Sequence, residues 1–471
     1  MDTIGAAAPP PPIRPGITAR LAEYVAASPT RELPRDIAEK AALHVLDTLA
    51  AVIACRDLEP ARVARAYATR NSGALTTPIL GTAETASLTD AVFATAMTAH
   101  AAEINDFCPS AYVQPGPAVV STALLLGHDR RIDGTRLLRA VVAGYEVACR
   151  LPKAIGAEEM RGTGVANHGV GSVFGAAVAA ASVLGHGADD VEHLLSLTAQ
   201  QASGSWQWLL DVEHIEKALV FAGMGARSGL QSALFVEAGF TGVPGSFDHE
   251  RGWLGSSYLA GGPAASDHDY LVRDLGTRFE LPLVGFKQFP VGGPTQPAVQ
   301  AVLGIAPGVR VAEIARVLVE MPSHNSRAFA TARMPALNLP YLASIILIDG
   351  RLDFVSAQSL ARMAGDAEVR AVMQKVEVRA DPAQNAMPRV ESARVTITHE
   401  DGSSRTHFVE HVKGFPSHPM STADVVAKAT SLVDPHLGSA RTSQLCDTVL
   451  GLDELERLDP LVELLVGPRI R

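Results

Sequence analysis

The chain changes character near Leu271, and this change constrains the fold more than any other feature of the sequence. Before it, apolar residues recur at helical spacing, most clearly in Leu33–Ala54. After it, Arg316–Met321 alternates as a β-strand does, and Asp401-Gly402 is a strong hairpin turn between two further strand-like segments. Helical spacing returns in Ser421–Leu461. The pattern predicts a mainly α protein with a smaller α+β domain.

The predicted domains follow from this pattern and from the length. A chain of 471 residues is too long for one ordinary core, so two domains are expected. We assign residues 17–270 and 418–471 to a helical domain and residues 271–417 to an α+β lid domain. Residues 1–16, rich in Ala and Pro, are predicted to be a disordered leader. Phe279–Phe286 is predicted to be a strand, confined to a sheet edge by Pro282.

Composition excludes several classes of function. The formal charge of −10 argues against binding to nucleic acid or to an anionic membrane. Aromatic residues are few, at 5%, which favours helices packed through small residues. The four cysteines lack paired spacing and are expected to be free thiols in a reducing compartment. The N-terminus does not have the pattern of a signal peptide, and apolar runs such as Leu137–Ala148 are short, so we expect a soluble cytoplasmic protein.

The segment Thr98–Val120 carries the densest polar cluster. His100 and Glu103 are three residues apart, which on a helix places them on one face, and Asp106 follows where that helix is expected to end. An imidazole and a carboxylate before a Pro- and Gly-broken loop suit proton transfer. The alternative, which periodicity alone favours, is that His100 is a hydrogen-bonded core residue and Asp106 caps the next turn.

Two other segments offer cations and backbone donors. Arg161–Gly171 is a glycine-rich loop before an Ala-rich helix, a natural anion site, and it carries His168. It matches neither a P-loop nor a dinucleotide fingerprint. Lys217 precedes an apolar helix, where it either ends in solvent or turns inward to hold a carboxylate. Lys287 lies in a turn-rich loop at the predicted domain junction, a common place for ligands.

Several segments, in this order, resemble the MmgE/PrpD family, which includes dehydratases, decarboxylases and epimerases of small polycarboxylates. The matching segments run from Asp47 to Arg351: Asp47-Thr48, His100–Asp106 (H-A-A-E-I-N-D), Gly144–Arg150 (G-Y-E-V-A-C-R), Phe174–Ala177, Lys217–Gly229, Lys287–Pro290 (K-Q-F-P) and Leu339–Arg351. The resemblance implies a helical domain with an α+β lid, a site in the cleft between them, a homodimer, and neither a metal nor an organic cofactor.

The site residues that the resemblance implies are carried over by position. Asp106, His168, Lys217 and Tyr341 are the catalytic candidates. His168 is the expected base because a histidine titrates near neutral pH, and Asp106 or Tyr341 is the expected group on the other face. Cations and N–H donors stabilise the enolate-like charge that the family's chemistry creates. The residues expected to bind substrate are Gln114, Asn167, Arg227, Lys287 and Gln296.

The chain also departs from the family pattern. Glu103 and Asn105 stand where aspartates are usual, Gln114 and Gln296 stand where histidines are usual, and His168 is displaced from the usual histidine position. A glutamine hydrogen-bonds a substrate but does not exchange a proton near pH 7. From the resemblance we expect a cofactor-independent lyase that eliminates water from a small di- or tricarboxylate, as a 2-methylcitrate dehydratase does, although these departures count against a standard dehydratase of that kind. The alternatives are an epimerase, a decarboxylase, and a non-catalytic binding member of the family.

Overall fold

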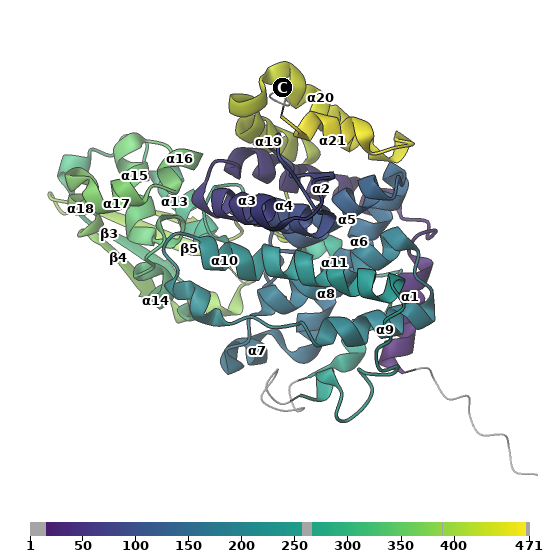
Figure 1. Ribbon diagram of the computed structural model, residues 1–471. Helices are drawn as coiled ribbons and strands as arrows, with labels where there is room; N and C mark the ends of the chain where they lie inside the picture. Colours follow the sequence, from purple (N-terminus) through teal and green to yellow (C-terminus); the bar gives the residue numbers. More distant parts are fainter. Residues whose placement is uncertain (1–15, 257–265, 389, 468–471) are drawn as a thin grey trace, which may run out of the picture.

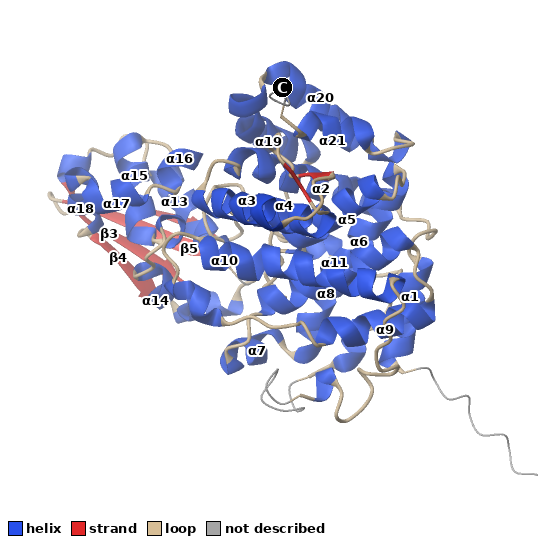
Figure 2. Ribbon diagram, in the orientation of Figure 1, coloured by secondary structure: helices blue, strands red, loops and turns tan. Residues whose placement is uncertain are grey.

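The fold was analysed in a computed structural model that describes residues 16–256, 266–388 and 390–467. A large helical body carries a smaller part in which helices cover a β-sheet on one side of the molecule (Figures 1 and 2). The predicted fold class, mainly α with a smaller α+β part, is confirmed. Residues 1–15 of the predicted leader lie outside the described residues.

The helical body is built from segments at both ends of the chain. Its N-terminal helices are α1 (Ile17–Ala27), α2 (Arg35–Cys55), α3 (Glu59–Asn71), α4 (Leu88–Ala99), α5 (Pro115–Asp129), α6 (Gly134–Ile155), α7 (Ala157–Thr163), α8 (Asn167–Leu184), α9 (Ala188–Ala199), α10 (Ile215–Ala218) and α11 (Met224–Glu237). A two-stranded ribbon, β1 (Thr77–Pro78) and β2 (Thr85–Ala86), precedes α4. The C-terminal helices are α19 (Thr422–Leu437), α20 (Ser439–Leu450) and α21 (Asp459–Leu465).

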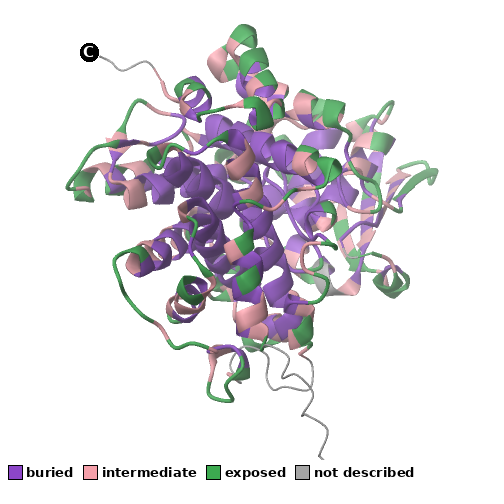
Figure 3. Cartoon of the chain, turned by 90° about the vertical axis from the view of Figure 1, so that its right-hand side faces the viewer, coloured by how far each residue is buried: buried purple, intermediate pink, exposed green. Residues whose placement is uncertain are grey.

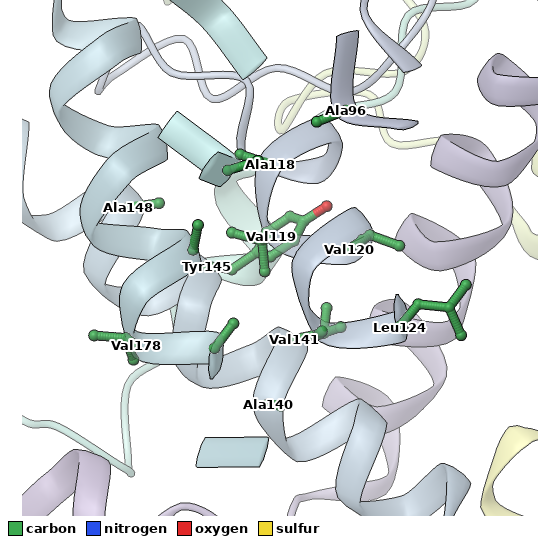
Figure 4. Close-up of a cluster of buried hydrophobic side chains, with 14 of the residues drawn as sticks. Ala96, Ala118, Val119, Val120, Leu124, Ala140, Val141, Tyr145, Ala148 and Val178 are labelled. Carbon is green, nitrogen blue, oxygen red and sulfur yellow. The ribbon is translucent and has the colours of Figure 1, made fainter. Parts of the chain in front are cut away.

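Helix α8 lies at the centre of this body, where α5, α6 and α11 pack on it. Small residues set the spacing: a Cβ added to Gly175 would lie 2.8 Å from the Ala148 Cβ and 3.0 Å from the Gly144 carbonyl oxygen, so α6 and α8 approach too closely for a larger side chain. The residues of the central helices are almost all buried (Figure 3). Short aliphatic side chains surround Tyr145 within it (Figure 4). This confirms the expectation of helices packed through small residues.

Within the described residues, two helical segments are long and apolar enough to cross a membrane. They are α8 and the continuous segment Ile215–Glu237. In the folded chain, 94% of α8 and 61% of the apolar window of the second segment are buried inside the protein. Their apolar character is therefore used in packing within the core.

The α+β part contains a four-stranded mixed sheet in the order β4-β3-β5-β6. Strand β3 (Ile314–Met321) pairs in parallel with β4 (Val376–Ala380) and antiparallel with β5 (Ala393–His399), and β5 forms the predicted hairpin with β6 (Ser404–Val409). The sheet's helices are α13 (Gln296–Ile305), α14 (Ser323–Ala330), α15 (Leu339–Asp349), α16 (Phe354–Ala357), α17 (Leu360–Gly365) and α18 (Ala367–Met373). Helices α14–α18 form the crossover that a parallel pair requires.

The predicted strand Phe279–Phe286 is wrong. The segment contains a 3₁₀ turn at Leu281–Leu283 instead. The Glu280 N–H donates to the buried Glu146 carboxylate, and Gly285 pairs with Phe107 in an isolated antiparallel bridge. The backbone of this segment thus binds a side chain and one bridge partner and does not pair along its length with a neighbouring strand.

The C-terminal helices are attached to the body by a buried ion pair. Helix α19 packs on α2, and the Lys428 ammonium lies 2.5 Å from Oδ1 of Asp47, with the two side chains 9% and 1% exposed. Lys428 also donates to the Ile104 carbonyl oxygen, beside the polar loop after α4. This one lysine therefore joins α2, α19 and that loop.

We predict that Lys428→Met lowers the free energy of unfolding by about 3 kcal/mol, because it leaves the buried Asp47 carboxylate without its partner. Urea unfolding measures the loss. The control is Lys413→Met, which breaks an ion pair with Asp424 in which both side chains are 31% exposed, and this change should cost about 1 kcal/mol or less. Equal losses for the two variants would contradict the role given to Lys428.

Candidate active site

A cavity lies between the helical body and the α+β part. Its empty volume is about 540 Å³, a figure that includes solvent space at its open mouth. The polar lining residues all come from the helical body: Glu103, Gln114, Arg161, His168 and Lys217. The remaining wall is apolar and comes from both parts: Phe107, Tyr112, Trp206, Trp208, Leu209 and Phe221 from the body, and Gly292, Gly293, Pro294, Ala328, Phe329 and Leu337 from the α+β part.

The Glu103 carboxylate is the centre of the site. Its Oε1 accepts a hydrogen bond from the Lys217 ammonium, and its Oε2 accepts one from the Lys287 ammonium at 2.8 Å. His214 Nε2 donates to Oε1 at 3.2 Å. All four side chains are buried. Glu103 therefore holds together the two lysines that were predicted for the site.

Opposing effects set the charges of this cluster. Burial raises the pKa of the Glu103 carboxyl, but Lys217 and Lys287 more than offset it, so the pKa is held well below its ordinary value and Glu103 is ionised. Burial lowers the pKa of the Lys217 ammonium, and Glu103 opposes that effect. The site thus contains one fixed carboxylate and a lysine whose proton is held less firmly than usual.

His100 lies behind Glu103 and is not part of a helical face with it. Helix α4 ends at Ala99, so the prediction that His100 and Glu103 share one face of a helix is wrong. Both residues are nevertheless buried, with His100 Nε2 4.0 Å from Glu103 Oε1. His100 Nδ1 donates to Asn105 Oδ1 at 2.7 Å, and burial keeps the pKa of His100 well below its ordinary value, so its ring is neutral. This matches the expected supporting role.

His168 lies in a box of aromatic rings. Its ring stacks on Phe221 with centroids 3.7 Å apart, and Trp206 and Trp208 meet it edge-on at 5.4 and 5.6 Å. Its Nδ1 atom is buried without a hydrogen-bond partner among the described residues. Burial, assisted by the nearby Lys217 ammonium, holds the pKa of His168 well below its ordinary value. His168 is therefore a neutral imidazole and a weak base.

An irregular backbone places the lysine and the aromatic wall. His214 adopts a left-handed conformation, with φ of 66°, immediately before α10. The Asp211 carboxylate accepts a hydrogen bond from the Lys217 N–H at 2.9 Å, and a π-helical turn, Leu219–Gly223, follows. The Phe221 carbonyl oxygen in that turn accepts a hydrogen bond from Ser172 of α8. Such turns and strained residues are frequent at functional sites.

Asp106, predicted to be catalytic, does not line the cavity. Its carboxylate accepts hydrogen bonds from Tyr145 at 2.6 Å, from His44 at 3.0 Å and from the Gly116 N–H at 3.2 Å. Burial raises the pKa of Asp106, but these donors lower it below its ordinary value. The carboxylate therefore fixes the start of α5, and with it Gln114 at the cavity wall. This is the capping role that was the alternative for Asp106.

The other predicted residues divide between the cavity and its surroundings. Gln114, His168 and Lys217 line the cavity, and Lys287 supports it through Glu103. Gln296 pins the 289–291 loop by bonding the backbone of Phe289 and Val291. The Tyr341 hydroxyl donates to the Ser356 carbonyl oxygen, Asn167 donates to the Ala157 carbonyl oxygen, and Arg227 donates to Tyr67. These four side chains are not among the residues that line the cavity.

Sequence reasoning missed the aromatic wall and His214. Periodicity gives no sign that Trp208 faces Phe221 and Lys217, or that Trp206 lies beside Trp208. His214 stands three residues before Lys217, a spacing that could have linked the two on one helical face. The structure instead brings His214 to Glu103 through a turn, which no periodic pattern predicts.

Among the described residues, one group has the geometry to hold a metal ion. Ligand atoms of His100, Glu103 and His214 lie within 4.8 Å of one another. Both oxygens of Glu103 are already held by ammonium groups, so a divalent cation would enter beside two positive charges. The donor set therefore fits a metal poorly and fits a hydrogen-bonded ion cluster well.

Comparison with known proteins covers most of the chain. Residues 19–262 match the model of the MmgE/PrpD N-terminal domain, and residues 289–452 match that of the MmgE/PrpD C-terminal domain. Among curated proteins, the chain is 24% identical to a cis-aconitate decarboxylase of Aspergillus terreus, with 96% of both chains covered. It is 23% identical to a cis-aconitate decarboxylase of Homo sapiens, with 90% of this chain and 89% of that protein covered.

The buried neutral histidines predict a loss of stability in acid. Burial lowers the pKa of His44 to about 4 and lowers those of His100, His168 and His214, whereas in the unfolded chain they titrate near about 6.5. Below about pH 6.5 the unfolded chain binds protons at these histidines that the folded chain does not bind. The free energy of unfolding therefore has its full value above this pH and falls as the pH is lowered further. Each histidine contributes up to about 1.4 kcal/mol per pH unit.

Urea unfolding at several pH values between 7.5 and 5.5 measures this slope. His168→Gln should reduce the slope by removing one of the four groups. A free energy of unfolding that stays flat across this range would contradict the neutral, buried state of these rings.

Proposed function

The chain belongs to the MmgE/PrpD family, and from this we propose that it is a cofactor-independent lyase that removes carbon dioxide from a small unsaturated polycarboxylate. A lyase-type activity is supported by the family and by the cis-aconitate decarboxylases that the chain resembles. The observation that carries the proposal is the Lys217 ammonium, held at the wall of a mostly apolar cavity by the ionised Glu103 carboxylate.

Positive charge favours a carboxylate substrate. Lys217 lines the cavity and Lys287 lies directly behind it, so two ammonium groups surround Glu103, the one carboxylate among the described residues that line the cavity. An anion that enters this cavity meets an excess of positive charge where aromatic walls reduce competition from water. Electrostatic binding therefore brings a substrate carboxylate to Lys217.

The arrangement suits decarboxylation in one step of bond breaking and one of protonation. The carbon–carbon bond to the departing carboxylate breaks, and its electron pair delocalises through the double bond toward a remaining carboxylate. The cations stabilise that enolate-like charge. Lys217 then transfers a proton to carbon and recovers one from solvent, so each turnover releases one carbon dioxide and takes up one proton.

The apolar wall of the cavity favours the loss of the substrate carboxylate as carbon dioxide. Trp208 and Phe221 adjoin Lys217, whose ammonium lies 4.7 Å from the Trp208 ring centroid and 5.0 Å from that of Phe221. An apolar environment disfavours a carboxylate relative to neutral carbon dioxide. A lysine whose pKa is lowered by burial is also a better proton donor than one in water.

Dehydration, expected first from the sequence, becomes the second candidate. It requires a base for the proton next to the carboxylate and an acid for the leaving hydroxyl. His168, with an unpartnered Nδ1 and a place at the cavity wall, is the base that this reaction would use. Its lowered pKa makes it a weak base, which favours decarboxylation. Independence of metal and a homodimeric state are also proposed, from the family resemblance.

We predict that the purified protein converts cis-aconitate, or a related unsaturated polycarboxylate, with release of carbon dioxide and incorporation of one deuterium from D₂O, followed by proton NMR. Lys217→Met should reduce kcat by about 10² to 10⁴-fold. Lys217→Arg keeps the charge but cannot donate a proton near neutral pH, so it should retain binding and lose turnover.

Other outcomes separate the alternatives. Loss of water from a hydroxylated polycarboxylate, abolished by His168→Ala, would assign dehydration. Deuterium exchange without elimination would assign epimerisation. Thermal stabilisation by polycarboxylates without any turnover would assign a binding protein. Full activity in both Lys217 variants would remove Lys217 from the reaction.

A second prediction concerns the pH dependence of kcat. If Lys217 is the proton donor, kcat falls as the pH rises through the pKa of Lys217, which gives the pH profile an alkaline limb. Because burial lowers this pKa, the limb should lie below the ordinary lysine value of about 10.4. Because Glu103 raises the pKa of Lys217, Glu103→Gln should move the limb to still lower pH. An alkaline limb that does not move in Glu103→Gln would contradict this coupling.

A further inference from the structure

We propose that His214 returns a proton from solvent to Lys217 by way of Glu103, and that this proton enters through a second cavity. The proposal rests on the decarboxylation proposed above, in which Lys217 gives one proton to carbon in each turnover and has to recover it. It assigns the route of that recovery, which does not pass through the cavity that the substrate occupies.

The second cavity lies between the helical body and the α+β part, and His214 is part of its wall. Its empty volume is about 760 Å³, a figure that includes solvent space at its open mouth. It shares no lining residue with the cavity that Lys217 lines. The α+β part contributes Met334, Pro335 and Leu360 to its wall. His214 therefore lines a space that is open to solvent and separate from the substrate cavity.

Hydrogen bonds join this wall to the candidate active site. His214 Nε2 donates to Glu103 Oε1 at 3.2 Å, and the Lys217 ammonium donates to the same oxygen. Glu103 and Lys217 line the first cavity, whereas His214 lines the second. A single carboxylate oxygen therefore lies between the imidazole and the amine, within hydrogen-bond reach of both, as a proton relay requires.

The other ring nitrogen of His214 is available to accept a proton. His214 Nδ1 is buried without a hydrogen-bond partner among the described residues, a state that costs free energy and calls for an explanation. Because Nε2 carries the proton donated to Glu103, Nδ1 of the neutral ring has a free lone pair. The backbone of His214, with φ of 66°, is also in a conformation that is unfavourable for a residue with a side chain and is frequent at functional sites.

The other donors near Glu103 lack such a route. The Lys287 ammonium binds Oε2, but its side chain is fully buried and lines neither cavity. His100 is also fully buried, with Nδ1 bound to Asn105 and Nε2 4.0 Å from Oε1. The substrate or the product occupies the first cavity during turnover. Among the described groups near Glu103, His214 is therefore the one that lines a cavity open to solvent and free of substrate.

The proposed relay moves one proton and leaves Glu103 unchanged. After Lys217 has protonated carbon, it is a neutral amine. A proton from water or from a buffer acid in the second cavity binds Nδ1 of His214, and the proton on Nε2 passes to Oε1 of Glu103 and from there to the amine. The N–H bond at Nε2 breaks and a new one forms at Lys217 Nζ. A half turn of the ring about its Cβ–Cγ bond then exchanges the two nitrogens and restores the donor to Glu103.

Chemical rescue tests the relay. His214→Ala should lower kcat for decarboxylation by about tenfold or more, with little change in KM, because His214 does not line the cavity that binds the substrate. Imidazole should restore kcat in a saturable way, since it fits the space that the ring leaves and reaches it through the second cavity. The bulkier buffer morpholinoethanesulfonate should restore much less. A normal kcat in His214→Ala, or a low kcat that imidazole does not raise, would overturn the proposal.

A second pair of variants tests the route without changing His214. Leu360→Trp fills part of the second cavity, so it should lower kcat severalfold and leave KM unchanged. The matched control is Ala361→Trp at the next residue, which is exposed and is not among the residues that line this cavity, and its kcat should equal that of the wild type. Equal kcat values for the two tryptophan variants would contradict the second cavity as the entrance.

The outcomes separate this proposal from the proposed reaction. If the wild-type protein decarboxylates its substrate and His214→Ala does so equally fast, the relay is wrong and the lyase proposal stands. If the wild-type protein releases no carbon dioxide from any unsaturated polycarboxylate, the lyase proposal fails and the relay fails with it. Release of carbon dioxide that requires either His214 or added imidazole supports both.

Discussion

The site depends on one buried carboxylate that two ammonium groups share. Glu103 comes from the loop after α4, Lys217 from the start of a long helical segment, and Lys287 from the chain that leads into the α+β part. A carboxylate without partners is expensive to bury, and so is an ammonium. The three segments are therefore held at fixed positions, and the floor of the cavity forms where they meet.

A second group of buried polar residues supports the loop that carries Glu103. Asp106 lies three residues after Glu103 and binds Tyr145 of α6, His44 of α2 and the first turn of α5. Lys428 reaches the same loop from α19 through the Ile104 carbonyl oxygen. Buried polar groups with several partners specify one arrangement of the elements that carry them. The loop that presents Glu103 is thus fixed from four directions, although it contains no regular secondary structure of its own.

The spacing of apolar residues predicted the helices and strands that bury one regular face. It failed for segments whose backbone is bound by distant side chains. Helix α4 begins after Ser87, whose hydroxyl accepts a hydrogen bond from the Asp90 N–H, as its sequence indicates. Strands β3 and β5 and the Asp401-Gly402 hairpin follow from alternation and turn chemistry. The segment before Phe286 does not, because its backbone groups bind Glu146 and Phe107, residues more than 100 positions away in sequence.

Sequence reasoning was limited in the same way at the candidate active site. Family resemblance led to Lys217, Lys287 and His168, because single residues were carried over by position. It did not show that Glu103 joins the two lysines, or that Asp106 supports the loop away from the cavity. Those roles depend on contacts between distant segments, such as the approach of Lys287 to Glu103 across 184 positions. Such contacts become visible only in the folded chain.

The opposing influences on Lys217 connect binding to chemistry. Burial among Trp208 and Phe221 lowers the pKa of its ammonium, and the Glu103 carboxylate opposes that effect. A second carboxylate, brought by the substrate, adds to the effect of Glu103 and keeps the lysine protonated while the anion is bound. In the proposed decarboxylation that carboxylate leaves as neutral carbon dioxide, so its support for the ammonium disappears and a carbanion forms nearby. In that reaction the proton is released most readily when the carbanion forms, and the aromatic walls keep water from providing the proton instead.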